Sequence, residues 1–339
     1  MKDNSYKKAL EPSLPGQFQG AFVTALVICS LLLFCESCNE DDKIDSFQTG
    51  EPISGIEIFY PLASFTGDPL MPKISPDGTM LLFTGPSNVQ GWQGLWIMNL
   101  ESQQLTQLHP NGRLADWSPD SGWVVFNNGT AIFKIRTDGT ELTMLLPNDG
   151  YYEPDWSHDD RIYFGGNQGA GIMNADGTNQ LFLSELGGQG DWHPQEDVII
   201  TIKASDSPVA WYQFFVCDPG ENSVLNMLGA KKNRLNQYPK YSPSGDQICF
   251  FNESGISIMN SNGENLTRII PSYLTGPDRK QNPKLYTAFP SWHPDGQRIV
   301  YENFEITKSK RVDGELLLEG YLRFYLVNVD AAINLTNLN

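Results

Sequence analysis

Two groups of residues in this chain have types and spacings that could support chemistry, and the first is a pair of cysteines. Cys35 and Cys38 are separated by two residues, a spacing found in redox pairs and in metal sites. They directly follow the apolar run Ala21–Phe34, which three lysines precede. Fourteen apolar residues are too few to cross a bilayer, and they match the hydrophobic core of a signal peptide. The pair therefore indicates export rather than redox or metal chemistry.

The end of this apolar run resembles the processing site of bacterial lipoproteins, which implies a lipid on Cys38. Cleavage before Cys38 leaves the small residue Ser37 at the end of the leader, whereas Cys35 follows the bulky Phe34. We expect residues 1–37 to be a lipoprotein signal peptide and residues 38–55 to be an acidic flexible tether. The expected location is the bacterial cell envelope, lipid-anchored to the outer membrane and either periplasmic or surface-exposed. An uncleaved signal anchor is the alternative.

The second group is the histidines, which could bind a metal if three of them converged. His158, His193 and His293 fall inside a repeated turn, and His109 stands alone in a predicted loop. We expect the three to be structural hydrogen-bonding residues, and we predict no metal and no cofactor. The chain also lacks the motifs of serine hydrolases, zinc peptidases, dinucleotide sites and phosphate-binding loops. We therefore predict no catalytic residues and expect that the protein is not an enzyme.

The elements that would position these residues belong to a unit that recurs six times. Each copy has a turn that begins with Ser or His, and consecutive turns start 36 to 51 residues apart. An aromatic residue precedes the turn in five copies and Ile74 in the other. The six turns begin at Ser75, Ser118, Ser157, His193, Ser242 and His293. Short runs rich in β-branched and aromatic residues follow, such as MLLFTG and LWIMNL, as expected for strands.

The repeat predicts an all-β fold, a six-bladed β-propeller of four-stranded antiparallel blades, over residues 56–339. One four-stranded sheet cannot bury both faces alone, whereas six arranged radially bury them against each other. Runs such as QQLTQL and INLTNL end the copies and would form the fourth strands. The segment Ile56–Phe59 precedes the first turn and is a spare strand that could close the ring onto blade six. Cys217 and Cys249 fall in neighbouring predicted blades, and the sequence is compatible either with two free thiols or with a disulfide between them.

The W-S-P-D-G-like turns, the I-M-N strands and the D-G turns followed by L-T resemble the repeats of the TolB-like β-propeller family. The resemblance covers nearly all of the chain after Cys38 and implies the same propeller fold. It implies no single function, because propellers of this kind have many different functions. About 17 residues separate Cys38 from the first predicted strand, so we expect the N-terminal α/β domain of TolB to be missing. Related propellers also include oligogalacturonate lyases, which hold a metal through histidines.

Long connections on one face of the predicted propeller are the expected binding surface, because loops on a rigid scaffold often carry function. They span residues 85–94, 147–154, 204–211, 229–240, 271–289 and 304–320, and the last three are rich in Lys and Arg. The opposite face carries short, uniform turns. The candidate partner-binding residues are Trp92, Tyr151, Tyr152, Lys232, Arg234, Tyr238, Tyr273, Arg279, Lys280, Lys310 and Arg311.

The net charge of −17 and the sequence pI near 4.5 argue against nucleic-acid binding, which needs a large basic surface. We expect a non-catalytic, lipid-anchored binding module, most simply a scaffold for an envelope protein or an acidic peptide segment. The alternative is a lipoprotein that captures an anionic glycan, with Trp92 and the loop tyrosines as stacking platforms. An oligogalacturonate-lyase-like enzyme is a third reading. The only expected membrane contact is the lipid anchor.

Overall fold

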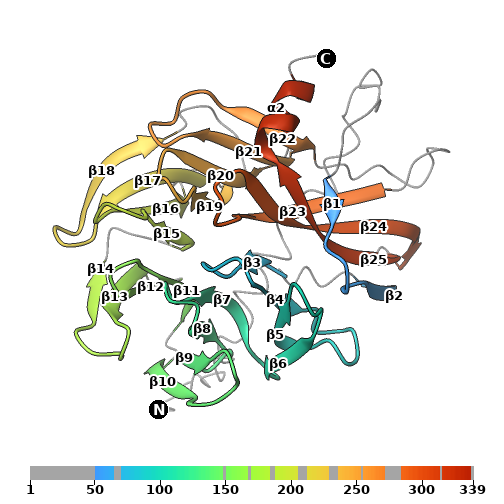
Figure 1. Ribbon diagram of the computed structural model, residues 1–339, viewed down its shortest axis with the longest axis horizontal. Helices are drawn as coiled ribbons and strands as arrows, with labels where there is room; N and C mark the ends of the chain where they lie inside the picture. Colours follow the sequence, from blue (N-terminus) through green and yellow to red (C-terminus); the bar gives the residue numbers. More distant parts are fainter. Residues whose placement is uncertain are drawn as a thin grey trace, which may run out of the picture.

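The computed structural model describes residues 50–64, 70–147, 150–166, 169–183, 188–204, 212–228, 236–252, 255–271, 284–313 and 315–336. Six antiparallel sheets are arranged as blades around a central channel (Figure 1), which confirms the predicted six-bladed β-propeller. In each of blades one to five the four strands pair in sequence order, and the first strand is the innermost. Within these described ranges, no helix is long and apolar enough to span a membrane.

The first three blades occupy residues 73–183. Blade one contains β3 (Lys73–Ile74), β4 (Met80–Gly85), β5 (Gly94–Asn99) and β6 (Leu105–His109). Blade two contains β7 (Arg113–Trp117), β8 (Trp123–Asn127), β9 (Ala131–Arg136) and β10 (Thr143–Pro147). Blade three contains β11 (Tyr151–Trp156), β12 (Arg161–Gly166), β13 (Gly169–Asn174) and β14 (Leu181–Leu183).

The other three blades complete the circle. Blade four contains β15 (Gly190–Trp192), β16 (Ile199–Ala204), β17 (Tyr212–Asp218) and β18 (Ser223–Leu228). Blade five contains β19 (Gln237–Tyr241), β20 (Gln247–Asn252), β21 (Gly255–Asn260) and β22 (Thr267–Pro271). Blade six contains β23 (Lys284–Trp292), β24 (Arg298–Val312) and β25 (Glu315–Asn328), joined by β1 (Glu51–Pro52) and β2 (Ile58–Ser64).

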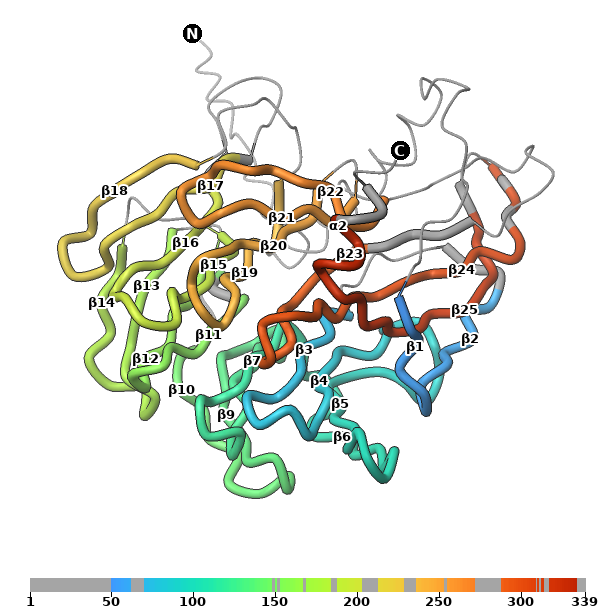
Figure 2. Tube along the Cα trace, turned by 45° about the horizontal axis from the view of Figure 1, so that its top comes forward, coloured from blue at the N-terminus to red at the C-terminus, as the bar shows by residue number. Residues whose placement is uncertain are grey.

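The N-terminal strands close the ring on blade six. Both β1 and β2 pair antiparallel with β25, so these blue strands lie beside the red strand β25 (Figure 2). The expectation that the segment around Ile58 closes the ring is confirmed. The expectation that INLTNL forms the last strand is wrong, because the edge of β25 is already occupied. The chain instead forms α2 (Val329–Thr336), whose Val329 and Ala332 pack into a cluster with residues of blade five.

Blade six also differs from prediction at residues 304–320, where we expected a long loop. Strands β24 and β25 continue as one hairpin across this region, and Val312 still pairs with Glu315. Alternation of apolar residues explains the extension, since Phe304, Ile306 and Leu318 are buried in a cluster with β2. The Lys-rich stretch therefore belongs largely to a strand.

The repeated turns fold alike because the first side chain of each accepts backbone hydrogen bonds. The hydroxyl of Ser75 accepts from the N–H of Met80, and that of Ser118 accepts from Trp123. In two other blades the Nδ1 atom of a histidine takes this role: His193 accepts from Glu196, and His293 from Asp295. The predicted structural role of these two histidines is confirmed.

The aromatic residues before these turns pack between blades. Trp117 of blade two, for example, shares an apolar cluster with Leu82 and Leu95 of blade one. Burial of such faces between blades is the main stabilising term of a propeller. The cysteines left open above, Cys217 and Cys249, are buried free thiols and do not form a disulfide. Burial raises the pKa of the Cys249 thiol well above its ordinary value.

Candidate functional site in the central channel

Each inner strand brings one residue to the same level of the central channel, the residue directly before the repeated aromatic. Together these six positions form what we call the channel ring. In blade order the ring consists of Lys73, Asp116, Asp155, Asp191, Lys240 and Ser291. A cavity of about 430 Å³ lies at the ring and is lined by all six residues and by prolines of the repeated turns. The cavity therefore lies at the face that carries the short turns.

A β-bulge in the inner strands helps to place the ring residues. In blades two, three, five and six the register shifts just before the ring position. The residue three before the aromatic has a positive φ in each case, for example 51° at Leu114 and 61° at Glu153. A bulge bends its strand and re-aims the next side chains. Left-handed backbone at non-glycine residues costs energy, so its recurrence indicates that the surrounding fold imposes it.

The three ring aspartates join consecutive blades through one oxygen each. Asp116 Oδ2 accepts the backbone N–H of Trp156 in blade three at 2.8 Å. Asp155 Oδ2 accepts that of Trp192 in blade four at 3.1 Å. Asp191 Oδ2 accepts that of Tyr241 in blade five at 2.7 Å. Each carboxylate thus accepts a backbone N–H of the next blade that has no partner within that blade's own sheet.

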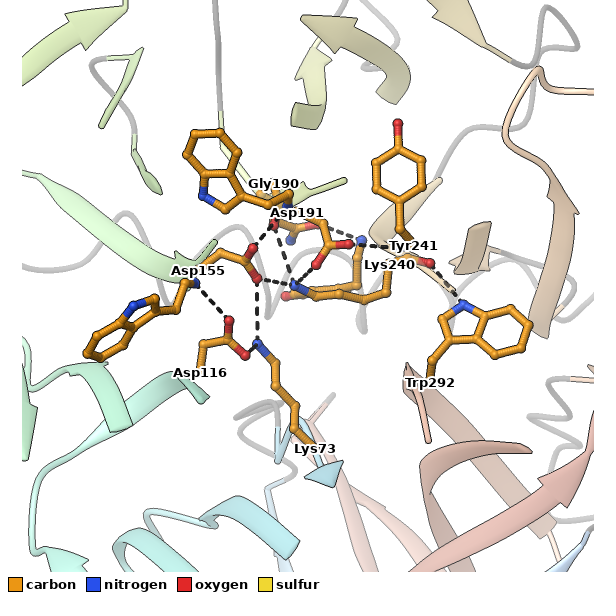
Figure 3. A network of polar contacts seen from close by, with 12 residues as sticks. Lys73, Asp116, Asp155, Gly190, Asp191, Lys240, Tyr241 and Trp292 are labelled. Atoms are coloured by element: carbon orange, nitrogen blue, oxygen red, sulfur yellow. Dashed lines mark hydrogen bonds and ion pairs between the residues drawn. The ribbon is translucent and has the colours of Figure 1, made fainter. Parts of the chain in front are cut away.

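The other oxygen of each aspartate pairs with a lysine (Figure 3). Lys240 Nζ lies 2.6 Å from Asp155 Oδ1 and 2.7 Å from Asp191 Oδ1. Lys73 Nζ lies 2.7 Å from Asp116 Oδ1 and 3.8 Å from Asp155 Oδ1. Asp155 is therefore the centre of the network, and Lys240 links blade five to blade three across the channel.

Burial dominates the electrostatics of the ring. Desolvation raises the pKa of Asp116, Asp155 and Asp191. Lys240 opposes that rise in all three, and Lys73 opposes it in Asp116 and Asp155. For Lys240, burial alone would lower the pKa, but the three carboxylates raise it well above its ordinary value. Lys240 is therefore an ammonium at neutral pH, held by carboxylate counter-charges.

A further acid contacts this network from β11. Burial raises the pKa of Glu153 to about 7, and the ammonium groups of Lys240 and Lys73 and the Gln189 side chain oppose the rise. Within the described ranges no group of three or more His, Cys, Asp and Glu side chains is arranged to hold a metal ion. The described lining is thus a pre-arranged set of ion pairs beneath a cavity whose walls include prolines and aromatic residues.

The structure places three of the sequence-predicted binding side chains. Trp92 is partly buried with its ring 5.7 Å from that of Trp96, whose Nε1 donates to the Trp92 carbonyl. Tyr238 is buried, with its ring 4.6 Å from that of Phe289. Lys310 is exposed on β24. Trp92 and Tyr238 pack in the same apolar cluster, of which Lys310 is not a member.

The remaining candidates are not described at the level of the side chain. Tyr151, Tyr152 and Arg311 lie on strands β11 and β24, but only their backbone is described. The others lie outside the described residues: Cys38, Lys232, Arg234, Tyr273, Arg279 and Lys280. Binding by the long-loop face therefore stays a prediction.

Sequence reasoning missed the channel ring, although a signal for it was present. Aligning the six repeats puts K, D, D, D, K and S directly before the aromatic position. Lys240 falls at the end of the predicted long loop 229–240, whereas it lies on β19 with its ammonium in the channel. Charged residues at one register position of an inner strand were the observation that could have identified the site.

No family model matches the chain. The chain is 35% identical over 78 residues to a probable dipeptidyl-aminopeptidase B of Colletotrichum graminicola, which is 20% of this chain and 8% of that protein. It therefore spans a small part of the length of this curated relative.

Solved structures share the fold. TolB from Acinetobacter baumannii is similar with a TM-score of 0.54 and 17% identity, covering 73% of this chain and 67% of TolB. A chain of the hydrazine synthase of Kuenenia stuttgartiensis has the same TM-score at 11% identity, covering 89% of this chain and 83% of that one. At these identities the likeness concerns the fold alone, and by fold this protein is a six-bladed β-propeller similar to that of TolB.

Proposed function

We propose that this protein is a non-catalytic binding module of the bacterial cell envelope, lipid-anchored through Cys38, whose channel cavity receives a segment of a partner protein. The observation that carries this proposal is the channel ring. Its ion pairs fix the floor of a cavity of about 430 Å³ before any ligand arrives, which reduces the entropy cost of binding. Exposed residues at the mouth, Pro76, Pro119, His158 and Pro243, offer a contact surface around it.

The hydrogen bonding of the ring supports binding rather than catalysis. All six oxygens of its three aspartates accept a hydrogen bond from a backbone N–H or a lysine ammonium. These bonds stabilise the ionised carboxylates and fix each of them between neighbouring blades. The carboxylates are therefore better suited to hold blades together than to abstract protons.

Site-specific photo-cross-linking in intact cells tests which face binds. A photoreactive residue replaces His158 at the cavity mouth, Lys310 on the β24 hairpin, or Asp138 on an outer turn of blade two. All three positions are exposed. We expect a protein adduct from position 158 and none from position 138, which lies on the same face but at the periphery. Adducts from position 310 alone would favour the long-loop face. An absence of adducts from both position 158 and position 310 would contradict the proposal.

The anchor is tested separately. Replacing Cys38→Ala removes the only thiol that the predicted processing site can modify, so the protein should move from the membrane fraction to the soluble fraction. Stable anchoring needs more than one acyl chain, so the shift should be nearly complete. Cys35→Ala is the matched control and should leave the protein in the membrane. Equal membrane retention of both variants would overturn the assignment of Cys38.

A further inference from the structure

The six junctions between blades at the channel ring are of three kinds. At three of them a ring aspartate accepts the N–H of the next blade's aromatic residue. At two others the ring residue is lysine, and the indole N–H of the next tryptophan donates to the lysine carbonyl instead. These bonds join Trp117 to Lys73 at 3.1 Å and Trp292 to Lys240 at 3.0 Å. The remaining junction, from blade six to blade one, has Ser291 and Ile74, which can form neither bond.

The junction from blade six to blade one has hydrogen-bond donors but no carboxylate to accept from them, unlike the three junctions that contain a ring aspartate. The N–H of Ser75 bonds to Met80 on β4, so the N–H of Ile74 points away from β4, as that of Trp156 does from β12. The residue in the preceding blade that corresponds to Asp116 is Ser291, whose hydroxyl has no hydrogen-bond partner within the described residues. The ring is thus one carboxylate short.

Lys73, the residue before Ile74, lines the same cavity and adds a third donor. Its ammonium has three N–H groups but only one carboxylate oxygen at hydrogen-bond distance, Asp116 Oδ1 at 2.7 Å. Asp155 Oδ1, at 3.8 Å, is too far for a hydrogen bond. Lys240, in contrast, has two oxygens within 2.7 Å. The six oxygens of the aspartates are all engaged, so the unused capacity here is capacity to donate.

We propose that the cavity binds a carboxylate group of a partner polypeptide at Ser291, where it takes the place of the missing ring aspartate. One oxygen would accept from the N–H of Ile74 and the other from Lys73, the division that Asp191 shows with Tyr241 and Lys240 of its next blade. Charge-assisted bonds of this bidentate kind are strong and directional. The inference rests on the proposed binding function of the cavity and names the group that is recognised.

A polypeptide fits this cavity better than a sugar acid. Sugars bind proteins largely by stacking on exposed aromatic rings, but the five aromatic residues at the cavity are only 5% to 8% exposed. An extended peptide needs no such platform. A peptide carboxylate has two sources, a C-terminus and an acidic side chain, and both have the chemistry that the ring lacks.

Calorimetric titration of the full mature chain with four probes tests the proposal. The probes are Ac-Gly-Ser-Ala-Gly as the free acid, the same peptide as its amide, the amide Ac-Gly-Asp-Ala-Gly-NH2, and galacturonate. We expect the free acid or the aspartyl peptide to bind at least about ten-fold more tightly than the uncharged amide. The proposal would be overturned if neither the free acid nor the aspartyl peptide bound more tightly than the uncharged amide. Tighter binding of galacturonate would favour a glycan and also overturn it.

Variants at Ser291 locate the site. Ser291→Asp supplies the missing carboxylate from the chain itself, so it should abolish the preference for acid over amide and raise the melting temperature. Ser291→Ala keeps the space and should weaken binding only several-fold, since one neutral donor is lost. Retained binding by Ser291→Asp would place the carboxylate elsewhere. If adducts from position 158 persist while acid and amide bind equally, the binding function stands and only the carboxylate inference falls.

Discussion

Replacing Asp155→Ala is expected to lower the free energy of unfolding by about 3–5 kcal/mol, because it removes the centre of a buried ion-pair network. The change leaves Lys240 with one carboxylate and leaves the N–H of Trp192 without its acceptor. The Asp155 side chain is only 5% exposed, so solvent screens its ion pairs little. Urea unfolding at pH 7, followed by tryptophan fluorescence, measures the effect.

An exposed ion pair of the same length is the control for this result. Asp197 lies 2.6 Å from Arg161, the separation of Asp155 from Lys240, but its side chain is 60% exposed. Asp197→Ala should cost at most about 1 kcal/mol, since surface ion pairs contribute little. Asp155→Asn, which keeps the shape of the side chain, should lie between the two. If Asp155→Ala and Asp197→Ala destabilise equally, the ring does not hold the blades together.

Replacing Glu302→Gln is expected to stabilise the protein at alkaline pH. Glu302 is 2% exposed on β24, and burial raises its pKa from 4.5 to about 8, opposed by hydrogen bonds from the backbone N–H groups of Leu70 and Met71. The folded chain therefore keeps a proton that the unfolded chain releases above pH 4.5. This group's contribution to the free energy of unfolding falls as pH rises from about 4.5 to about 8, and then levels off.

The expected size of this effect is about 5 kcal/mol across the whole window, from about 1.4 kcal/mol for each unit of pKa shift. Glutamine keeps an acceptor for the N–H of Leu70, 3.0 Å from the carboxylate, and carries no charge. Urea unfolding at pH 5, 6.5, 8 and 9 should show near-equal stability at pH 5 and a growing advantage of the variant above it. Glu264→Gln, on an exposed turn, controls for the loss of one surface carboxylate. Parallel profiles for wild type and Glu302→Gln would contradict the assignment.

The repeat architecture could be predicted from the sequence because its signals are local. The Asp-Gly and Asn-Gly turns, the short apolar strands and the aromatic residue before each turn all act within one blade. The closing strand was also predictable, since Ile58 lies on a strand with no partner nearby in the sequence. The strand with which it pairs was not predictable. The sequence therefore favoured the C-terminal segment as the fourth strand of blade six, whereas β1 and β2 occupy that edge.

The candidate site could be predicted only in part. The ring residues were visible as charged residues at one register position, but nothing in the sequence states which of them meet. Lys240 and Asp155 are 85 residues apart, and Lys73 and Asp116 are 43 apart. A strand's own pattern reports which side chains face a neighbouring blade, but not the charge that the neighbour presents.

The sequence alone therefore determined the fold: six repeated units, each with turns and strands specified by its own residues, predicted a six-bladed propeller. Only the tertiary structure decided the site, because closure of the ring brings side chains from separate blades to one level of the channel. There, burial makes each carboxylate depend on an ammonium group or an N–H from another blade. The absence of a carboxylate at Ser291 became meaningful only once the other five positions of the ring were seen together.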